Sequence, residues 1–253
     1  MVLDSFKLNG KVAIVTGCST GLGQGMCAGL AEAGADIVGV GTADASETRA
    51  MVEKLGRRFH WIGADLMTTE PVARIIDETV KTFGRLDILV NNAGIIRRQD
   101  ALEFSEKDWD DVMSINAKVV FFLSQAAARR FLAQHSRGKI INIASMLSFQ
   151  GGIRVPSYTA SKSAVVGVTR LLANEWAKHG INVNAIAPGY MVTTNTAALR
   201  ADAARSKEIL ARIPAGAWGM PEDLKGPVVF LASDASNYVH GYTVAVDGGW
   251  LAR

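Results

Sequence analysis

The chain lacks the features that mark several large classes of protein. It has no run of about 18 uncharged apolar residues, and its first nine residues contain Asp4 and Lys7 instead of the apolar centre of a signal peptide. Its only cysteines, Cys18 and Cys27, are too few for a disulfide framework. We therefore expect a cytoplasmic protein with no membrane span, in which both thiols are buried and reduced.

Histidine and charge content exclude two further classes. The 4 histidines are scattered without the spacing of metal ligands, so we predict no catalytic metal. A formal net charge of +3 does not indicate a nucleic-acid partner, although it suits an anionic cofactor and substrate. Hydrophobic residues make up 49% of the chain and charged residues 20%, which is typical of a globular protein with a large core.

Short apolar runs alternate with helix-length amphipathic segments. The alternation predicts a single α/β domain over residues 1–253, a Rossmann-type doubly wound parallel sheet with helices on both faces. Residues 191–218 differ, being alanine-rich and polar, and we expect them to form a mobile lid over the site. The expected strands are 11–15, 36–40, 86–90, 139–144, 182–186 and 243–246, and the expected helices are 23–33, 71–83, 109–131 and 157–179.

A glycine-rich turn, T-G-C-S-T-G-L-G, links the first expected strand to the first expected helix. Glycines let the backbone turn tightly and approach a pyrophosphate, and the helix that follows presents free N–H groups to the phosphates. A glycine turn in this position favours a dinucleotide site. The residues expected to contact the dinucleotide here are Gly17, Ser19, Thr20, Gly21, Leu22 and Gly23.

Tyr158 and Lys162 are four positions apart, so on a helix both point the same way. The pKa of a free tyrosine is near 10, and a nearby ammonium group favours the phenolate. Lys162 is placed to supply that charge, and Ser145, at the end of a strand, can hydrogen-bond a substrate oxygen. Asn116 is a poor residue for the middle of a helix. Taken alone, the tyrosine–lysine pair also fits a helix surface, and Asn116 fits a buried amide satisfied by the backbone.

In combination and in order, these features resemble the short-chain dehydrogenase/reductase family along essentially the whole chain. The order is the glycine turn, N-N-A-G at 91–94, Asn116, Ser145, the tyrosine–lysine pair, and P-G at 188–189. The resemblance implies hydride transfer between a nicotinamide cofactor and a carbinol or carbonyl carbon.

The resemblance also implies roles for single residues. Tyr158 would be the catalytic base, Lys162 would also hold the nicotinamide ribose, and Asn116 would anchor a water that links Lys162 to solvent. Ser145 completes the catalytic group. The further cofactor contacts that the family pattern implies are Thr42, Asp65, Leu66, Asn91, Ala93, Gly94, Pro188, Gly189, Val192 and Thr193.

The end of the second expected strand departs from the pattern of NAD-binding units, which place an acidic residue there for the adenosine ribose. Here that position is Gly41, and Asp44 lies just beyond it. No arginine or lysine occurs in the glycine turn or at positions 40–46, so a 2′-phosphate would meet no opposite charge. We therefore expect NAD in preference to NADP.

Three arginines and a glutamine lie beside the expected site. Arg97 and Arg98 follow N-N-A-G directly, and Gln150 and Arg154 lie between Ser145 and the helix of Tyr158. Arginine forks suit a carboxylate, so the cluster predicts an acidic substrate, with Arg154 ranked first among the three. We expect substrate contacts from Arg97, Arg98, Ser145, Gln150, Arg154 and Tyr158.

Two sequence runs refine the substrate. Residues 96–104 and 145–156 are similar to members of the family that act on sugar acids, as is the ending D-G-G-W-L-A-R. This likeness implies NAD-linked interconversion of a hydroxyl and a ketone on a sugar acid, in uronate and pectin catabolism.

Two other functions remain open at this point. One is a 3-oxoacyl carrier-protein reductase, although such enzymes usually carry an arginine in the glycine turn, where this chain has C-S-T. The other is a catalytically silent NAD-binding regulator, against which the intact Ser145, Tyr158 and Lys162 argue.

The family resemblance further implies a homotetramer. The expected helices 109–131 and 157–179 have apolar residues to spare for an interface. The C-terminal run W-L-A-R (250–253) is apolar enough that we expect it to pack on a neighbouring subunit.

Overall fold

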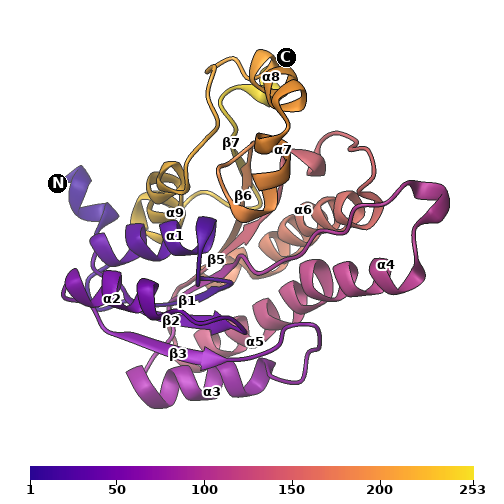
Figure 1. Ribbon diagram of the computed structural model, residues 1–253. Coiled ribbons are helices and arrows are strands. Elements are labelled where there is room, and N and C mark those ends of the chain that lie inside the picture. Colours follow the sequence, from indigo (N-terminus) through magenta and orange to yellow (C-terminus); the bar gives the residue numbers. More distant parts are fainter.

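The computed structural model describes residues 1–253, and one seven-stranded parallel sheet forms its centre. The strand order is β3-β2-β1-β4-β5-β6-β7 (Figure 1). The inner strands are short apolar runs buried on both faces, as a parallel sheet covered by helices requires. The strands are β1 (Val12–Thr16), β2 (Asp36–Gly41), β3 (Phe59–Gly63), β4 (Ile88–Asn91), β5 (Gly138–Ile143), β6 (Ile181–Pro188) and β7 (Thr243–Val246).

Helices cover both faces of this sheet (Figure 1). Helices α1, α2 and α9 pack on one face, and α3, α5 and α6 pack on the other. The helices are α1 (Gly21–Glu32), α2 (Ser46–Lys54), α3 (Val72–Phe83), α4 (Glu106–Met113), α5 (Val119–Ala133), α6 (Pro156–Trp176), α7 (Ala197–Ala201), α8 (Ala203–Arg212) and α9 (Lys225–Ala232).

The two faces carry separate hydrophobic cores of 22 buried residues each. Strand β1 shows how they arise, because successive side chains of a strand point to opposite faces. Ala13 and Val15 belong to the core under α1, whereas Val12 and Ile14 belong to the core under α5. The predicted single-domain, doubly wound α/β fold is confirmed.

Near the edge of the sheet, α2 was not predicted, and no bounds were predicted for β3, the strand before Asp65. Strand β3 is the edge strand, and most of its residues are only half-buried, so it lacks the apolar run that marks an inner strand. Helix α2 buries only Thr48 and Val52, which leaves little hydrophobic pattern to detect.

The predicted helix over 109–131 is wrong in one respect, because a π-helical turn at Ser114–Lys118 separates α4 from α5. The wide turn contains Asn116, which is 1% exposed and hydrogen-bonds the backbone of Ile95 on a neighbouring loop. Single π-turns inside helices are frequent at functional sites.

Residues 191–218, expected to be an irregular lid, instead contain α7, α8 and a short 3₁₀ turn (Thr194–Thr196). A β-bridge between Met191 and Gly219 closes the base of this segment. Figure 1 shows α7 and α8 together near the C-terminus, at the end of the molecule reached by β6 and β7.

The sheet topology itself indicates where a ligand would bind. The chain order reverses between β1 and β4, which are neighbours although β2 and β3 intervene in the sequence. In open parallel sheets, ligands bind at the carboxyl ends of the strands beside such a reversal. None of the helices combines the length and the apolar character that a membrane span needs.

Candidate active site

The glycine-rich turn lies where β1 ends, at the reversal point of the sheet. Gly17 and Gly21 both have positive φ angles, 64° and 57°, which favour glycine. A Cβ on Gly17 would lie 2.9 Å from the Cα of Ala93, and a Cβ on Gly23 would lie 2.1 Å from the carbonyl oxygen of Gly17. Glycine is therefore needed here for close packing, and the turn leads into the N-terminus of α1, whose free N–H groups suit a dinucleotide pyrophosphate.

Residues that the sequence analysis left out hold this turn in place. The amide of Asn92 donates to the carbonyl oxygens of Thr16 and Gly17, at 2.8 and 2.9 Å. The hydroxyl of Thr16 accepts from the backbone N–H groups of Asn92 and Ala93. On the other side, the buried hydroxyl of Thr48 donates to the carbonyl oxygen of Cys18. Asn92 could have been found from its place in N-N-A-G, but nothing in the sequence marked Thr48.

Of the other predicted cofactor residues, one supports the sheet from inside and the rest lie at the ends of strands or in the loops that follow. Asn91 is buried and donates to Ser124 and Asn142, so it steadies the sheet. Asp65 is exposed and accepts from the N–H of Met67, which caps its own turn. The remaining predicted residues lie where strands end or in the loops that follow: Thr42 after β2, Leu66 after β3, Ala93 and Gly94 after β4, Pro188 at the end of β6, and Gly189, Val192 and Thr193 after it.

The end of β2 is bare of charge. A Cβ on Gly41 would lie 3.2 Å from the ring of Trp61, which stands on the adjacent strand β3. The carboxylate of Asp44 accepts hydrogen bonds from the backbone and the hydroxyl of Ser46, so it is directed toward the start of α2.

Ser145, Tyr158 and Lys162 come together from two elements. Ser145 follows β5, and its hydroxyl accepts from the N–H of Leu147 at 3.2 Å, which turns the chain into a short 3₁₀ segment. Tyr158 and Lys162 share one face of α6, and the ammonium nitrogen of Lys162 lies 5.7 Å from the centre of the Tyr158 ring. The structure therefore brings the predicted catalytic residues together.

The charges around Tyr158 differ from the expectation. Burial raises the pKa of Tyr158, and the Ser145 hydroxyl and the positive charge of Arg98 oppose that rise. The ammonium group of Lys162 donates to the carbonyl oxygen of Ile143 at 2.6 Å, so in the free protein it is hydrogen-bonded to the backbone of β5. Burial also lowers the pKa of Lys162 itself to about 8.

Asn116 is fully engaged by protein groups. Its oxygen accepts from the N–H of Ile95 at 2.9 Å, and its nitrogen donates to the carbonyl oxygen of Ile95 and to the Ser161 hydroxyl. The side chain thus joins the loop after β4 to α6, one turn from Tyr158. This is the arrangement of a satisfied buried amide, the alternative that the residue type alone favoured.

The three candidate arginines prove to be unequal. Arg97 pairs with Asp108 and Arg154 pairs with Asp100, each at 3.3 Å, so both already face a carboxylate. Arg98 has no carboxylate within 4 Å, and it donates to the carbonyl oxygen of Asn195. The structure therefore favours Arg98 over Arg154, which the sequence ranked first, because Arg98 lacks a carboxylate partner and its charge acts on the catalytic tyrosine.

A fourth arginine was not predicted. Arg212, at the end of α8, lies 4.0 Å from the ring of Trp250 and donates to the side-chain oxygen of Gln150 at 3.3 Å. Trp250 is 5% exposed and packs in a small core with Met146, next to Ser145, and with Ile213. The expectation that residues 250–253 pack on a neighbouring subunit is thus wrong for Trp250, which its own chain buries.

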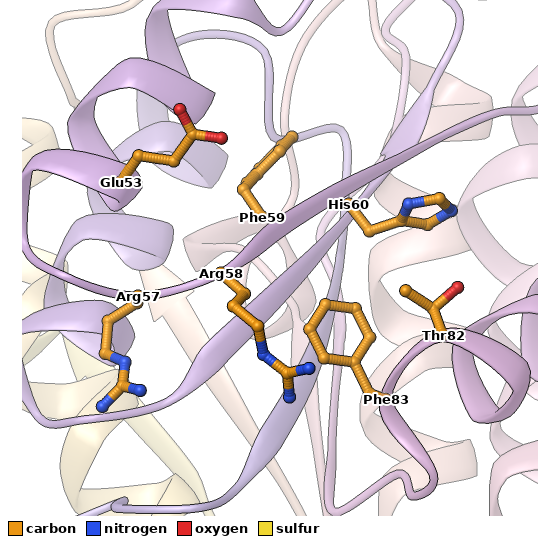
Figure 2. Close-up of a pocket in the computed structure, with 7 residues that line it drawn as sticks. All are labelled: Glu53, Arg57, Arg58, Phe59, His60, Thr82 and Phe83. Carbon is orange, nitrogen blue, oxygen red and sulfur yellow. The ribbon is translucent and has the colours of Figure 1, made fainter.

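One cavity of about 500 Å³ lies away from this site. Figure 2 shows it at the amino-terminal end of β3, with the Arg58 guanidinium beside the Phe83 ring. Arg57 and Arg58 both lie within 3.3 Å of the Asp36 carboxylate at the start of β2. Because parallel strands place this cavity at the opposite edge of the sheet from Ser145, it is not part of the catalytic group.

The comparison with known proteins agrees with this geometry. A family model described as Enoyl-(Acyl carrier protein) reductase matches residues 17–251. A short-chain type dehydrogenase/reductase from Mycobacterium marinum is 34% identical, superimposes with a TM-score of 0.94, and is covered over 100% of both chains. The chain belongs to the short-chain dehydrogenase/reductase family.

Within this family, sugar-acid dehydrogenases are close relatives. The 2-dehydro-3-deoxy-D-gluconate 5-dehydrogenase of Escherichia coli K12 is 70% identical over 253 residues, which is 100% of both chains. The crystal structure of a gluconate 5-dehydrogenase from Burkholderia cenocepacia, in complex with NADP and tartrate, is 39% identical. It covers 100% of both chains with a TM-score of 0.94. The chain is therefore an oxidoreductase of this family that uses a nicotinamide dinucleotide.

The lowered pKa of Lys162 predicts a pH-dependent stability of the protein without cofactor. The folded state releases this proton near pH 8 and the unfolded chain near 10.5, so the unfolded state binds more protons in between. Stability should therefore rise with pH across this window, by up to about 3 kcal/mol from Lys162. Lys162→Met should flatten the rise, as measured by urea unfolding at pH 7.5 and 10. Equal slopes in the two proteins would contradict the assignment.

Proposed function

We propose that the chain is an NAD-dependent dehydrogenase that interconverts 2-dehydro-3-deoxy-D-gluconate and 3-deoxy-D-glycero-2,5-hexodiulosonate, in uronate and pectin catabolism. The observation that carries this proposal is the 70% identity, across the whole of both chains, to the Escherichia coli enzyme named for the first compound. The buried, free thiols of Cys18 and Cys27 suit a reducing compartment, and we place the enzyme in the cytoplasm.

The chemistry assigns one task to each catalytic residue. In the oxidising direction Tyr158 accepts the proton of the substrate hydroxyl, and Ser145 hydrogen-bonds the same oxygen. The nicotinamide ring, when bound, takes up or gives the hydride. Lys162 holds the ribose next to that ring, and its positive charge, 5.7 Å from the centre of the Tyr158 ring, favours the phenolate. Asn116 fixes the loop after β4 against α6.

The proposed cofactor preference rests on the residues that follow β2. No arginine or lysine occurs at positions 40–46, and the first charged residue after β2 is Asp44. A 2′-phosphate there would lack a counterion, so we propose NAD as the working cofactor, held at Gly17, Gly21, Gly23 and the strand ends named above. The Burkholderia relative carries NADP in its crystal structure, so both cofactors belong in the assay.

The deciding experiment is an assay of the purified protein with NADH and NADPH against a panel of carbonyl compounds. The panel contains the hexodiulosonate, 5-keto-D-gluconate, a neutral keto sugar and a 3-oxoacyl thioester. We expect the highest kcat/KM for the hexodiulosonate with NADH. Best turnover of the thioester would instead identify a carrier-protein reductase, and a higher kcat/KM with NADPH would overturn the cofactor assignment.

Tyr158→Phe serves as the blank, because loss of the general base should lower kcat by roughly 10²–10⁴-fold.

A regulator without activity would behave differently in the same assay. It would bind NADH, seen as a change in nicotinamide fluorescence, and turn over no member of the panel. Tyr158→Phe would then match the wild-type protein in every measurement.

The substrate carboxylate, remote from the reacting carbon, is assigned to Arg98. Arg98→Met should raise KM for the acid by roughly ten- to a hundredfold with a smaller change in kcat, because a charge-assisted hydrogen bond contributes about 1.5–3 kcal/mol. Arg154→Met is the matched comparison, since Arg154 already pairs with Asp100 and should have the smaller effect. If Arg154→Met has the larger effect on KM for the acid and neither changes KM for the neutral sugar, the ranking from the structure is wrong.

We also propose that the enzyme is a homotetramer. Trp109, Phe122 and Leu171, on α4, α5 and α6, are 41%, 39% and 49% exposed, so the outer side of this helical layer carries large apolar side chains that a partner subunit would cover. Sedimentation at micromolar concentration should give four times the mass of the chain, and a monomer under those conditions would refute the assembly.

A further inference from the structure

A short segment of the lid crosses from the cofactor turn toward the loop after β4. Residues 193–196, here called the strap, contain Thr193 and the 3₁₀ turn Thr194–Thr196. The methyl group of Thr193 lies 3.5 Å from the position that a Cβ on Gly21 would take. Gly21 is the first residue of α1, so one end of the strap rests on the N-terminus that faces the phosphates.

The other end of the strap is held by Arg98. Its guanidinium donates to the carbonyl oxygen of Asn195 at 3.1 Å. No other hydrogen bond joins the loop after β4 to residues 191–218. At the base of the segment the backbone N–H of Val192 donates to the carbonyl oxygen of Gly219, so the segment is fixed there, and Arg98 supplies its one hydrogen bond to the loop after β4.

The strap is also braced internally, so it would move as a unit. The hydroxyl of Thr196 donates to the carbonyl oxygen of Met191 at 2.6 Å, and Arg200 donates to the carbonyl oxygen of Thr193 at 3.1 Å. A braced segment moves as a unit, so a single polar contact with a neighbouring loop can bias its position.

We propose that Arg98 is a positioning residue that latches the strap over the bound dinucleotide, so that release of the cofactor requires the hydrogen bond between Arg98 and Asn195 to open. Arg98 uses one N–H for this contact and has no carboxylate within 4 Å, so its remaining donors are free for the substrate. A carboxylate bound there leaves the latch in place. This proposal depends on the proposed dinucleotide site, but it does not depend on which sugar acid is the substrate.

The latch is tested on the complex with NADH alone, without substrate. Stopped-flow fluorescence measures the dissociation rate of NADH from the wild-type protein, Arg98→Met and Arg98→Lys. Methionine cannot donate to Asn195, so NADH should leave roughly tenfold faster. Lysine can donate to a carbonyl oxygen and should restore most of the wild-type rate. The control is Arg205→Met, since Arg205 lies on α8 in the same lid and pairs only with Glu208 at the surface.

Limited trypsin digestion gives a second measurement that does not depend on turnover. Arg200 lies on α7, just beyond the strap, and cleavage after it reports whether the strap is engaged. NADH should protect this bond in the wild-type protein and in Arg205→Met, but only weakly in Arg98→Met. Thermal melting of each variant separates these effects from a general loss of fold.

The outcomes distinguish the latch from the proposed function. If Arg98→Met raises KM for the sugar acid but leaves NADH dissociation and Arg200 protection unchanged, Arg98 binds substrate and the latch is overturned. If NADH leaves faster while the panel shows no sugar-acid preference, the latch stands and the substrate assignment fails. Faster dissociation in Arg205→Met to the same extent would also overturn the latch, because the effect would then belong to the lid in general.

Discussion

The side-chain amide of Asn92 makes the contact on which the rest of the site depends. It ties the end of β4 to the carbonyl oxygens of Thr16 and Gly17, which lie 76 and 75 positions away in the sequence. At a reversal point the loops that follow two neighbouring parallel strands leave a crevice at the carboxyl edge of the sheet. The amide of Asn92 bridges these two loops and fixes the distance between the phosphate turn and the loop that carries Arg98.

The arginines around the pocket differ in whether each forms an ion pair with a carboxylate. The loops that flank the site contain several arginines, but Asp108 and Asp100 each take one of them, so these two contribute little field at the catalytic tyrosine. Arg98 faces only a neutral partner, the carbonyl oxygen of Asn195. Burial of Tyr158 opposes the phenolate, and the hydroxyl of Ser145 and the charge of Arg98 favour it. In the free protein, Ser145 and Arg98 therefore both favour the charged form of the Tyr158 base.

Much of the architecture could be predicted because it follows from the pattern of apolar residues and from the order of motifs along the chain. Buried strands such as β4 are continuous apolar runs, and the glycine turn between β1 and α1 has few other uses. Helix α2 and the bounds of the edge strand β3 could not be predicted, since these elements bury few residues and their pattern is weak. The break at Asn116 follows from a contact with Ile95, twenty-one positions away, which no local pattern encodes.

The ranking of the arginines shows the limit most clearly. The sequence does not show which of Arg97, Arg98 and Arg154 forms an ion pair. Their partners Asp100 and Asp108 look like ordinary surface residues. Which arginine is neutralised depends on how the loop after β4 folds back on residue 154, through the backbone hydrogen bond from Gln99 to Arg154. Pairing of this kind is a property of tertiary structure. The burial of Trp250 within its own chain was missed for the same reason.

The position of the Trp61 ring beside Gly41 limits which side chains can replace this glycine and contact the cofactor. An acidic side chain at the end of β2 would press against the indole ring on β3, since even a Cβ would lie 3.2 Å from it. A side chain at position 41 therefore fits only if the indole ring moves by a few tenths of an ångström. Cofactor choice in this chain is coupled to the packing of an edge strand.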